Sequence, residues 1–315
     1  MTNKTIVQLI VGSFKPESVN GVNTSIRQRN NSLENKGYKI EYIRVDGFYN
    51  FLRCLFVKIR PKVVFIDSLY YLPSLILALK FKIKKKANIF VWSHGALNVY
   101  NNEYKKSLYL NFISIIFKYV DLFLLAGKSE VNLARKLSLN YLLFGNPVPI
   151  NITRDININF VPNRLIYLGR FDYHGKGFDR MWTFLNNNIQ YSLDIYGKGE
   201  IINIPIDLLD RVTINEPIYG ISKYKIIQNS AALILLSRRE GLPMSCIEAL
   251  TLGVPIIVSE ECNIEQDKGV FLYNSKFNLS RYKRSEISKN NIKKYSISNY
   301  SNRLITLIEN KNTTK

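Results

Sequence analysis

Short apolar runs alternate with amphipathic stretches along the first half of the chain. The runs are rich in β-branched residues and end at polar or glycine positions, which is typical of buried strands. Strands are expected at Thr5–Gly12, Tyr38–Val45, Val63–Asp67, Ile89–Ser93, Leu122–Leu125 and Tyr141–Phe144. Helices are expected between them, at Val22–Lys36, Phe51–Arg60, Leu69–Phe81, Tyr104–Tyr119 and Ser129–Leu137. Strands that alternate with helices predict a doubly wound parallel sheet.

The alternation stops at Asn146-Pro147-Val148-Pro149 and restarts after the polar segment Asn151–Asn163. Further strands are expected at Leu165–Leu168, Ser192–Tyr196, Val212–Ile214, Ala232–Leu236, Pro255–Val258 and Val270–Leu272. Further helices are expected at Gly177–Asn187, Ser222–Asn229, Met244–Leu252 and near Ser298–Glu309. The sequence therefore predicts two Rossmann-like α/β domains, residues 1–150 and 151–315, that face a central cleft. Whether the last helix crosses back to the first domain stays open.

The stretch Ser237–Glu260 holds the most informative residues of the second domain. It reads as the end of a strand, a loop with Gly241 and Pro243, a helix and a second apolar strand. The loop leads into a helix N-terminus, where backbone N–H groups and the helix dipole favour a phosphate. Glu240 in the loop and Glu248 in the helix are carboxylates suited to the hydroxyl groups of a ribose or a hexose.

A second constellation, Gly169–Gly177, follows a predicted strand and opens a helix. Arg170 offers a planar fork of donors and Lys176 a point charge, a pairing suited to a diphosphate. Gly175 and Gly177 allow the backbone to approach a ligand closely. On composition alone such a segment is typical of a surface turn, and it is the pairing with the two glutamates that favours a binding site.

Residues 240–249, Glu-Gly-Leu-Pro-Met-Ser-Cys-Ile-Glu-Ala, resemble the two-glutamate motif of family 4 glycosyltransferases, which are retaining enzymes with the two-domain GT-B fold. Gly169–Gly177 is similar to the segment of that family whose arginine and lysine hold the diphosphate of the donor. The resemblance implies a donor site made of Arg170, Lys176, Glu240, Gly241, Leu242, Pro243, Met244 and Glu248.

The resemblance also reaches the first domain. Trp92-Ser93-His94-Gly95 is similar to the family's His-Gly pair, which faces the transferred sugar, whereas a lone histidine at a strand end is more often structural. The loop after the first strand carries Gly12 and Gly21, where the family has a double glycine that approaches phosphate and acceptor. Asn20-Gly21 supplies one glycine of that pair. The catalytic set implied by the resemblance is Glu240, His94, Arg170 and Lys176.

The charge and the cysteine content of the chain limit which binding partners and which chemistry are expected. The formal net charge is +20, and residues 1–150 hold 22 lysines and arginines against eight acids, with a cluster at Lys80–Lys86. Such a field attracts phosphates or an anionic membrane surface, and the alternative is a solvated lysine face. Three cysteines without metal-ligand spacing favour a reduced cytoplasmic setting and metal-independent chemistry. Neither a secretory segment nor an apolar stretch long enough to span a membrane is expected.

These patterns and the resemblance predict a transferase that moves a hexosyl unit from a nucleotide diphosphate sugar, without a further cofactor, to a hydroxyl acceptor. A lipid-linked saccharide of bacterial lipopolysaccharide, O-antigen or capsule synthesis would suit it, with the protein cytoplasmic and peripheral on the inner face of the plasma membrane. A sugar-nucleotide epimerase of similar fold is the main alternative and needs an acid or base in its cleft. A nucleic-acid binder lacks a recognised motif here. A non-catalytic subunit would have lost the charged residues.

Overall fold

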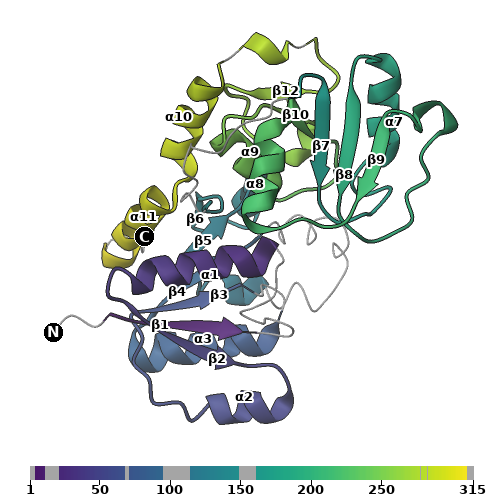
Figure 1. Cartoon of the computed structure of the whole chain (residues 1–315). Coiled ribbons are helices and arrows are strands. Elements are labelled where there is room, and N and C mark those ends of the chain that lie inside the picture. Colours follow the sequence, from purple (N-terminus) through teal and green to yellow (C-terminus); the bar gives the residue numbers. More distant parts are fainter. Residues whose placement is uncertain are drawn as a thin grey trace. The chain divides into compact units, whose positions relative to one another are not determined.

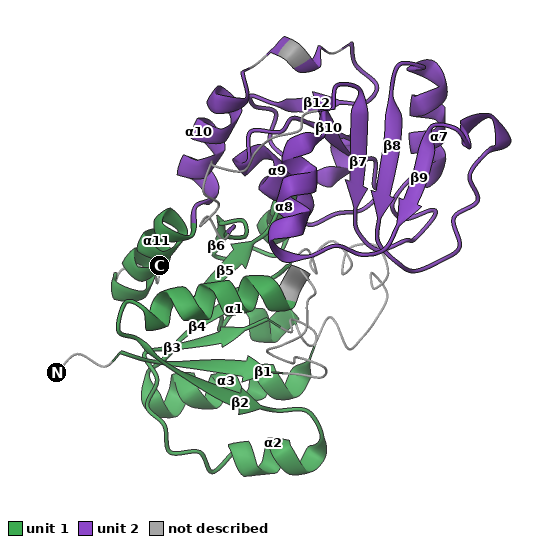
Figure 2. Ribbon diagram, viewed as in Figure 1, with its two compact units in different colours: residues 1–147, 297–315 green, residues 148–296 purple. Residues whose placement is uncertain are grey.

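The computed structural model describes residues 4–10, 21–67, 71–94, 114–148, 161–276, 278–281 and 283–310. The chain divides into two compact units, which Figure 2 draws in different colours. Unit 1 comprises Met1–Pro147 together with Ile297–Lys315, and unit 2 comprises Val148–Ser296. The end of the chain therefore belongs to the same unit as its N-terminal half.

Unit 1 is built on a parallel sheet of six strands in the order β2-β1-β3-β4-β5-β6 (Figure 1). The strands are β1 (Thr5–Ile10), β2 (Lys39–Arg44), β3 (Val63–Ile66), β4 (Asn88–Trp92), β5 (Leu122–Leu125) and β6 (Tyr141–Leu143). The helices are α1 (Gly21–Glu34), α2 (Phe48–Cys54), α3 (Leu72–Lys85), η1 (Lys128–Glu130), α6 (Val131–Lys136) and α11 (Ile297–Glu309), and residues 114–117 are also helical. Strands β3 and β5 are apolar and buried at every position because both faces of the sheet are covered.

The two faces of this sheet have separate cores. Ile6 and Val7 are neighbours on β1 and point to opposite faces, as successive residues of a strand do. Ile6 packs in one cluster with Leu304 of α11, and Val7 packs in another with Phe81 of α3. The last helix of the chain thus completes the core on one face of the first sheet.

Unit 2 contains a second parallel sheet, in the order β12-β11-β10-β7-β8-β9. The strands are β7 (Arg164–Leu168), β8 (Ser192–Tyr196), β9 (Val212–Asn215), β10 (Ala232–Leu235), β11 (Ile256–Val258) and β12 (Val270–Leu272). The helices are α7 (Phe178–Asn187), η2 (Ile206–Leu208), α8 (Gly220–Asn229), α9 (Met244–Thr251), η3 (Glu260–Cys262), η4 (Leu279–Arg281) and α10 (Arg284–Tyr295). Buried, largely apolar side chains from the strands and from helices such as α7 and α9 form one core around this sheet.

The predicted fold class is confirmed, because both units are doubly wound α/β structures with parallel sheets. The prediction for α2 was wrong by several residues: Phe51–Arg60 was expected, but the helix ends at Cys54. The ammonium of Lys80 lies 2.5 Å from the carbonyl oxygen of Leu55 and caps the end of α2, well before the proline that was expected to stop it. Helix α10 was not predicted, because its sequence RSEISKNNIKKY lacks an apolar stripe.

The strand order reverses at one place in each sheet. In unit 2 this place lies between the paired strands β7 and β10. From β7 the strand order continues to β9 at one edge of the sheet, and from β10 it continues to β12 at the other edge. In unit 1 the corresponding neighbours are β1 and β3. Open α/β sheets bind ligands at the carboxyl ends of the strands where the order reverses. These two edges are therefore the places at which a functional site is expected.

Candidate donor site and its counterpart in unit 1

Two loops of unit 2 lie together at the reversal point of its sheet. One loop follows β7 and covers residues 169–177, and the other follows β10 and covers residues 236–243. The backbone N–H of Arg238 donates to the carbonyl oxygen of Gly175 at 2.9 Å. A side chain at Gly177, which has a φ of 71°, would begin 2.1 Å from the carbonyl oxygen of Leu236. Gly177 is thus required by the contact between the two loops themselves.

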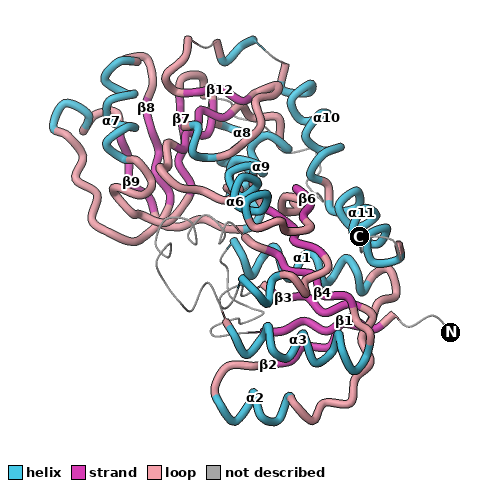
Figure 3. Tube along the Cα trace, turned by 180° about the vertical axis from the view of Figure 1, so that it is seen from behind, coloured by secondary structure: helices cyan, strands magenta, loops and turns pink. Residues whose placement is uncertain are grey.

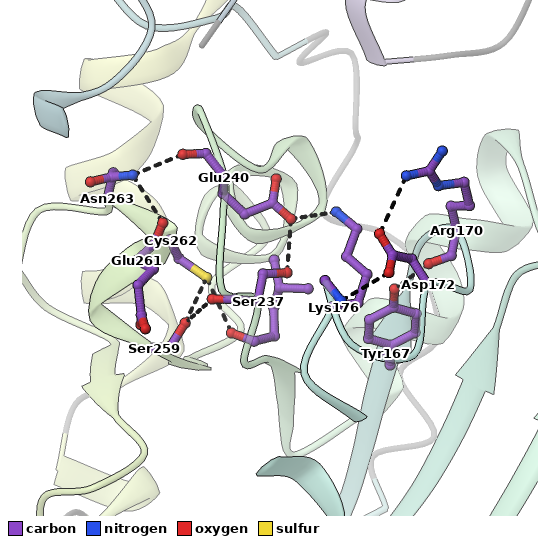
Figure 4. A network of polar contacts seen from close by, with 12 residues as sticks. Tyr167, Arg170, Asp172, Lys176, Ser237, Glu240, Ser259, Glu261, Cys262 and Asn263 are labelled. Atoms are coloured by element: carbon purple, nitrogen blue, oxygen red, sulfur yellow. Dashed lines mark hydrogen bonds and ion pairs between the residues drawn. The ribbon is translucent and has the colours of Figure 1, made fainter. Parts of the chain in front are cut away.

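Lys176 and Glu240 meet across these loops (Figure 4). The Nζ atom of Lys176 lies 2.5 Å from Oε1 of Glu240, and the same oxygen accepts a hydrogen bond of 2.9 Å from the hydroxyl of Ser237. The backbone carbonyl of Glu240 accepts from the side-chain amide of Asn263 at 2.8 Å. The side chains of Lys176 and Glu240 are 22% and 14% exposed. Two residues that the sequence predicted to share a site are therefore in contact and largely shielded from water.

Arg170 is held differently. Its side chain is 74% exposed, and its guanidinium pairs with the carboxylate of Asp172 at 3.5 Å. The backbone around it is fixed, because the Tyr167 hydroxyl donates to the carbonyl oxygen of Arg170 at 2.6 Å and the N–H of Gly175 donates to Asp172 at 2.8 Å. Burial and the nearby Glu240 carboxylate raise the pKa of Tyr167, so this hydroxyl remains a donor. In Figure 4 a dashed line joins the guanidinium of Arg170 to the carboxylate of Asp172.

Glu248 lies in a separate ion pair. It projects from α9, is 5% exposed, and its Oε1 lies 2.7 Å from Nζ of Lys223 in the neighbouring helix α8. Burial raises the pKa of the Glu248 carboxyl, and the Lys223 ammonium opposes that rise. Lys223 was not predicted from the sequence, because nothing in the spacing of residues 223 and 248 indicates that α8 and α9 place them together.

Two further ion pairs secure the frame of the site. Both carboxylate oxygens of Asp179, in the first turn of α7, accept from the guanidinium of Arg238 at 2.8 and 2.5 Å. Arg180 lies 2.8 Å from Glu261, which follows β11. Bidentate pairs of this kind fix orientation as well as charge. The loops that carry Lys176 and Glu240 are thus tied to each other and to the segment after β11.

The remaining predicted donor residues form the turn into α9. They are Gly241, Leu242, Pro243 and Met244, and the backbone N–H of Ile247 donates to the carbonyl of Pro243 at 3.3 Å. The helix therefore begins at the carboxyl edge of β10, where the sequence predicted it. The positive end of its dipole is available there to a negatively charged group.

In unit 1, His94 comes two residues after β4 and adopts the left-handed backbone region with a φ of 47°. This conformation costs a non-glycine residue on the order of 1–3 kcal/mol. The imidazole stacks on the ring of Trp92, with centroids 4.9 Å apart and planes 13° from parallel. Its Nε2 lies 2.9 Å from Oδ1 of Asp67. Strain, stacking and a hydrogen bond to a buried carboxylate together define the orientation of the ring.

Asp67 is the centre of a buried polar cluster that the sequence analysis missed. Oδ2 accepts from Nε2 of Gln8 at 2.6 Å, and the guanidinium of Arg29 lies 3.1 Å from both carboxylate oxygens. Arg29 also donates to the side-chain carbonyl of Gln8. The guanidinium lies over the ring of Phe65 at 4.2 Å. Burial raises the pKa of Asp67, but Arg29 and His94 outweigh that effect and hold the pKa well below its usual range.

Gly12 and Gly95 lie outside the described residues, and Gly21 is the first residue of α1. In the part of the chain that the structure describes, no three His, Cys, Asp or Glu residues gather as metal ligands. Within the same described ranges, no helix has the length and apolar character needed to cross a bilayer.

Comparison with known proteins bears on the fold and on unit 2. Residues 151–266 match the model of the family "Glycosyl transferases group 1", while a search of curated sequences found no match. Sucrose-phosphate synthase from Thermosynechococcus elongatus superposes with a TM-score of 0.71 at 13% identity, covering 96% of this chain and 98% of that one. The lipopolysaccharide outer core galactosyltransferase WaaB, in its apo form, gives 0.69 at 17%, covering 96% and 98%.

The Anabaena protein HepE, in complex with UDP and glucose, gives a TM-score of 0.70 at 10% identity, covering 97% of this chain and 99% of that one. These three structures are similar to this chain along nearly its whole length, and the identities are low enough that the likeness concerns the fold alone. The chain therefore has the GT-B fold of glycosyltransferases, and its second unit is similar to the glycosyl transferases of group 1.

Proposed function

We propose that this protein is a retaining, metal-independent glycosyltransferase that moves a hexosyl unit from a nucleotide diphosphate sugar to a hydroxyl acceptor. The match of residues 151–266 to glycosyl transferases of group 1 supports it, as does the binding of UDP and of UDP-glucose by HepE. The contact of Lys176 with Glu240 carries the proposal. It joins a cation suited to phosphate and a carboxylate suited to sugar hydroxyls at the reversal point of the sheet.

In the proposed reaction, the bond between the anomeric carbon and the diphosphate oxygen breaks. The nucleoside diphosphate leaves with the bonding electron pair, and the acceptor oxygen bonds to the anomeric carbon as its hydroxyl proton is lost. Lys176, Arg170 and the N-terminus of α9 stabilise the charge that develops on the leaving group. A lysine ammonium has three donors, so Lys176 can bind a phosphate oxygen while it keeps Glu240. One such group typically contributes ~10²–10³ in rate.

The acids are assigned to hydroxyl groups. Glu240 accepts from the donor sugar and Glu248 from the ribose, so Lys223 has to share or release the Glu248 carboxylate when the donor binds. By the same resemblance, His94 is assigned to the transferred sugar, and Gly12 and Gly21 are assigned to the phosphate and the acceptor. These roles rest on the resemblance of the motifs. The structure adds that the Glu248 carboxylate is paired with Lys223.

We further propose a lipid-linked saccharide as acceptor, in the synthesis of a bacterial surface polysaccharide such as lipopolysaccharide or capsule. A cytoplasmic protein that is peripheral on an anionic membrane would reach it. Helix α2 and the turn after it expose Phe48, Tyr49 and Phe56 by 78%, 71% and 81%. Helix α3 lies beside α2 in both views of the chain, and Lys80 bonds it to the carbonyl of Leu55 (Figure 1, Figure 3). Exposed aromatic side chains beside lysines suit lipid head groups.

The lysine cluster of α3 is smaller at the surface than the sequence indicates. Lys80 is used to cap α2, and Lys82 lies 2.6 Å from Asp121. Lys84 to Lys86 remain at the end of the helix, beside Ile83, which is 78% exposed. Co-sedimentation with anionic and with neutral vesicles at low salt tests the docking. Pelleting with neither, or equally with both, would remove the membrane part of the proposal and leave the transferase untouched.

The transferase itself is tested by a panel of nucleotide sugars. Thermal shift selects the donor, and release of nucleoside diphosphate is then measured with and without candidate acceptors. Lys176→Ala should abolish turnover, while Lys225→Ala, an exposed position on α8, should not. An epimerase would change the sugar without releasing the nucleotide. Full turnover in Lys176→Ala would overturn the assignment of the diphosphate site.

A further inference from the structure

The reversal point of the unit 1 sheet holds His94 together with three buried polar or charged side chains to which the proposed reaction assigns no role. Gln8 comes from β1, Arg29 from α1, and Asp67 and His94 follow the adjacent strands β3 and β4. The exposed fraction is 1% for Gln8 and zero for Arg29, and the side chains of Asp67 and His94 are 6% and 7% exposed. A fully buried guanidinium with a buried carboxylate is costly to desolvate and calls for an explanation beyond stability.

The carboxylate of Asp67 has no capacity left for a ligand. Oδ1 accepts from Nη1 of Arg29 and from Nε2 of His94, and Oδ2 accepts from Nη2 of Arg29 and from Nε2 of Gln8. A carboxylate offers about four lone-pair sites, and all four are occupied by these contacts. Asp67 can therefore influence a reactant only through one of its three partners.

Of the three partners of Asp67, His94 is the one through which Asp67 can act on a reactant. Because the Asp67 carboxylate is an acceptor, the ring nitrogen that meets it, Nε2, has to carry the proton. One face of the ring lies on Trp92, which itself stacks on Tyr300 with centroids 5.6 Å apart. None of the described residues forms a hydrogen bond with Nδ1, so in this part of the chain Nδ1 is the ring nitrogen that can meet a reactant.

We propose that Asp67, held by Gln8 and Arg29, is a positioning residue that fixes His94 with Nε2–H donated inward and Nδ1 presented to the reactant. In its neutral form the ring then offers a lone pair to a sugar or acceptor hydroxyl, and the same geometry would make Nδ1 a donor when the ring is charged. This assignment deepens the proposed transfer reaction and rests on it for the identity of the reactant, but the state of the ring can be measured without any activity.

The chain contains two histidines, which makes the ring state directly observable. Two-bond ¹H–¹⁵N spectra of ¹⁵N-histidine-labelled protein distinguish protonated from unprotonated ring nitrogens, and the His174→Asn variant assigns the signals. The neutral His94 ring is expected to be protonated at Nε2 alone, and Asp67→Asn is expected to mix or reverse the two tautomers. A wild-type ring protonated at Nδ1, or a spectrum unchanged by Asp67→Asn, overturns the proposal even if no transfer activity is ever found.

Kinetics provide the second readout once a donor is known. Asp67→Asn should lower kcat on the order of 10–100-fold with little change in the KM of the donor, as for other groups that orient a histidine. In a His94→Ala background the same change should have no further effect, because Asp67 acts through that ring. Effects of the two substitutions that multiply would contradict the proposal.

A folding control keeps the result interpretable. Asp67→Asn leaves the buried Arg29 without its counter-charge, so the single variant is compared with the double variant Arg29→Met, Asp67→Asn, which removes both charges. Thermal unfolding should recover in the double variant while kcat stays low. If the double variant unfolds and turns over like the wild type, the cluster is structural and the proposal fails.

Discussion

Replacing Lys223 by methionine should destabilise unit 2 in a way that depends on pH. The variant keeps the apolar stem of the side chain and removes the ammonium that lies 2.7 Å from the Glu248 carboxylate. The Glu248 side chain is 7% exposed and that of Lys223 is 22% exposed. At neutral pH the free energy of unfolding should therefore fall by about 2 kcal/mol, less than the ~3–5 kcal/mol typical of a fully buried pair that loses one partner.

The pH dependence follows from the carboxyl group. Burial raises the pKa of Glu248 above its ordinary value of 4.5, and Lys223 opposes the rise. A carboxyl whose pKa is higher in the folded state lowers the free energy of unfolding as the pH rises through that pKa. Without Lys223 the pKa should rise further. The difference between the two proteins should therefore be full at about pH 8 and small at about pH 4, where Glu248 is largely protonated in both.

The assay uses the two tryptophans, one in each unit. Trp92 lies in unit 1 and Trp182 in unit 2, so in a Trp92→Phe background the fluorescence reports unit 2 alone. Urea unfolding is followed at both pH values, with Lys225→Met as the control, because Lys225 is exposed on the same helix. A loss of equal size at both pH values, or an equal loss in the control, would refute the reasoning, since it would have to come from helix or packing effects.

Three further predictions concern the loops and the surface. Glu240→Gln keeps the size of the side chain and removes its charge, and kcat should fall by ~10²–10³ with the fold intact by circular dichroism. Gly177→Ala should lower the free energy of unfolding by about 2–4 kcal/mol, because overpacking against the Leu236 carbonyl adds to the strain at φ 71°. Gly220→Ala, at φ 60° with open space around it, should lose only about 1 kcal/mol or slightly more, and equal losses would contradict this account. Phe56→Ser should weaken co-sedimentation with anionic vesicles without changing thermal stability, and undiminished binding would exclude α2 from the docking surface.

Most of the fold could be predicted from the sequence, because the buried strands are apolar at nearly every position. β8 and β12 have the predicted bounds, and the alternation of strands with helices was sufficient for the parallel doubly wound architecture. Elements without an apolar stripe were not predictable in this way. Helix α10 is largely polar, and few of its residues, Ile287 among them, are buried.

The candidate site was accessible to sequence reasoning only where residues belong to local motifs. Lys176 and Glu240 each lie in a loop after a strand, and the pairing of β7 with β10 brings them together. Contacts that depend on the packing of helices have no such signal, and Lys223 was missed for that reason. Asp67 could have been predicted as a site residue, because a carboxylate that directly follows a buried strand lies at the edge where α/β sheets bind ligands.

The central claim is that Lys176 binds a diphosphate at the carboxyl ends of β7 and β10. The dissociation constant of the nucleoside diphosphate, measured by calorimetry for the wild type, Lys176→Ala and Lys225→Ala, tests it most directly. A charged hydrogen bond is worth about 1.5–3 kcal/mol, so Lys176→Ala should bind ~10–100-fold more weakly and Lys225→Ala like the wild type. Equal affinity of Lys176→Ala and the wild type would contradict the claim.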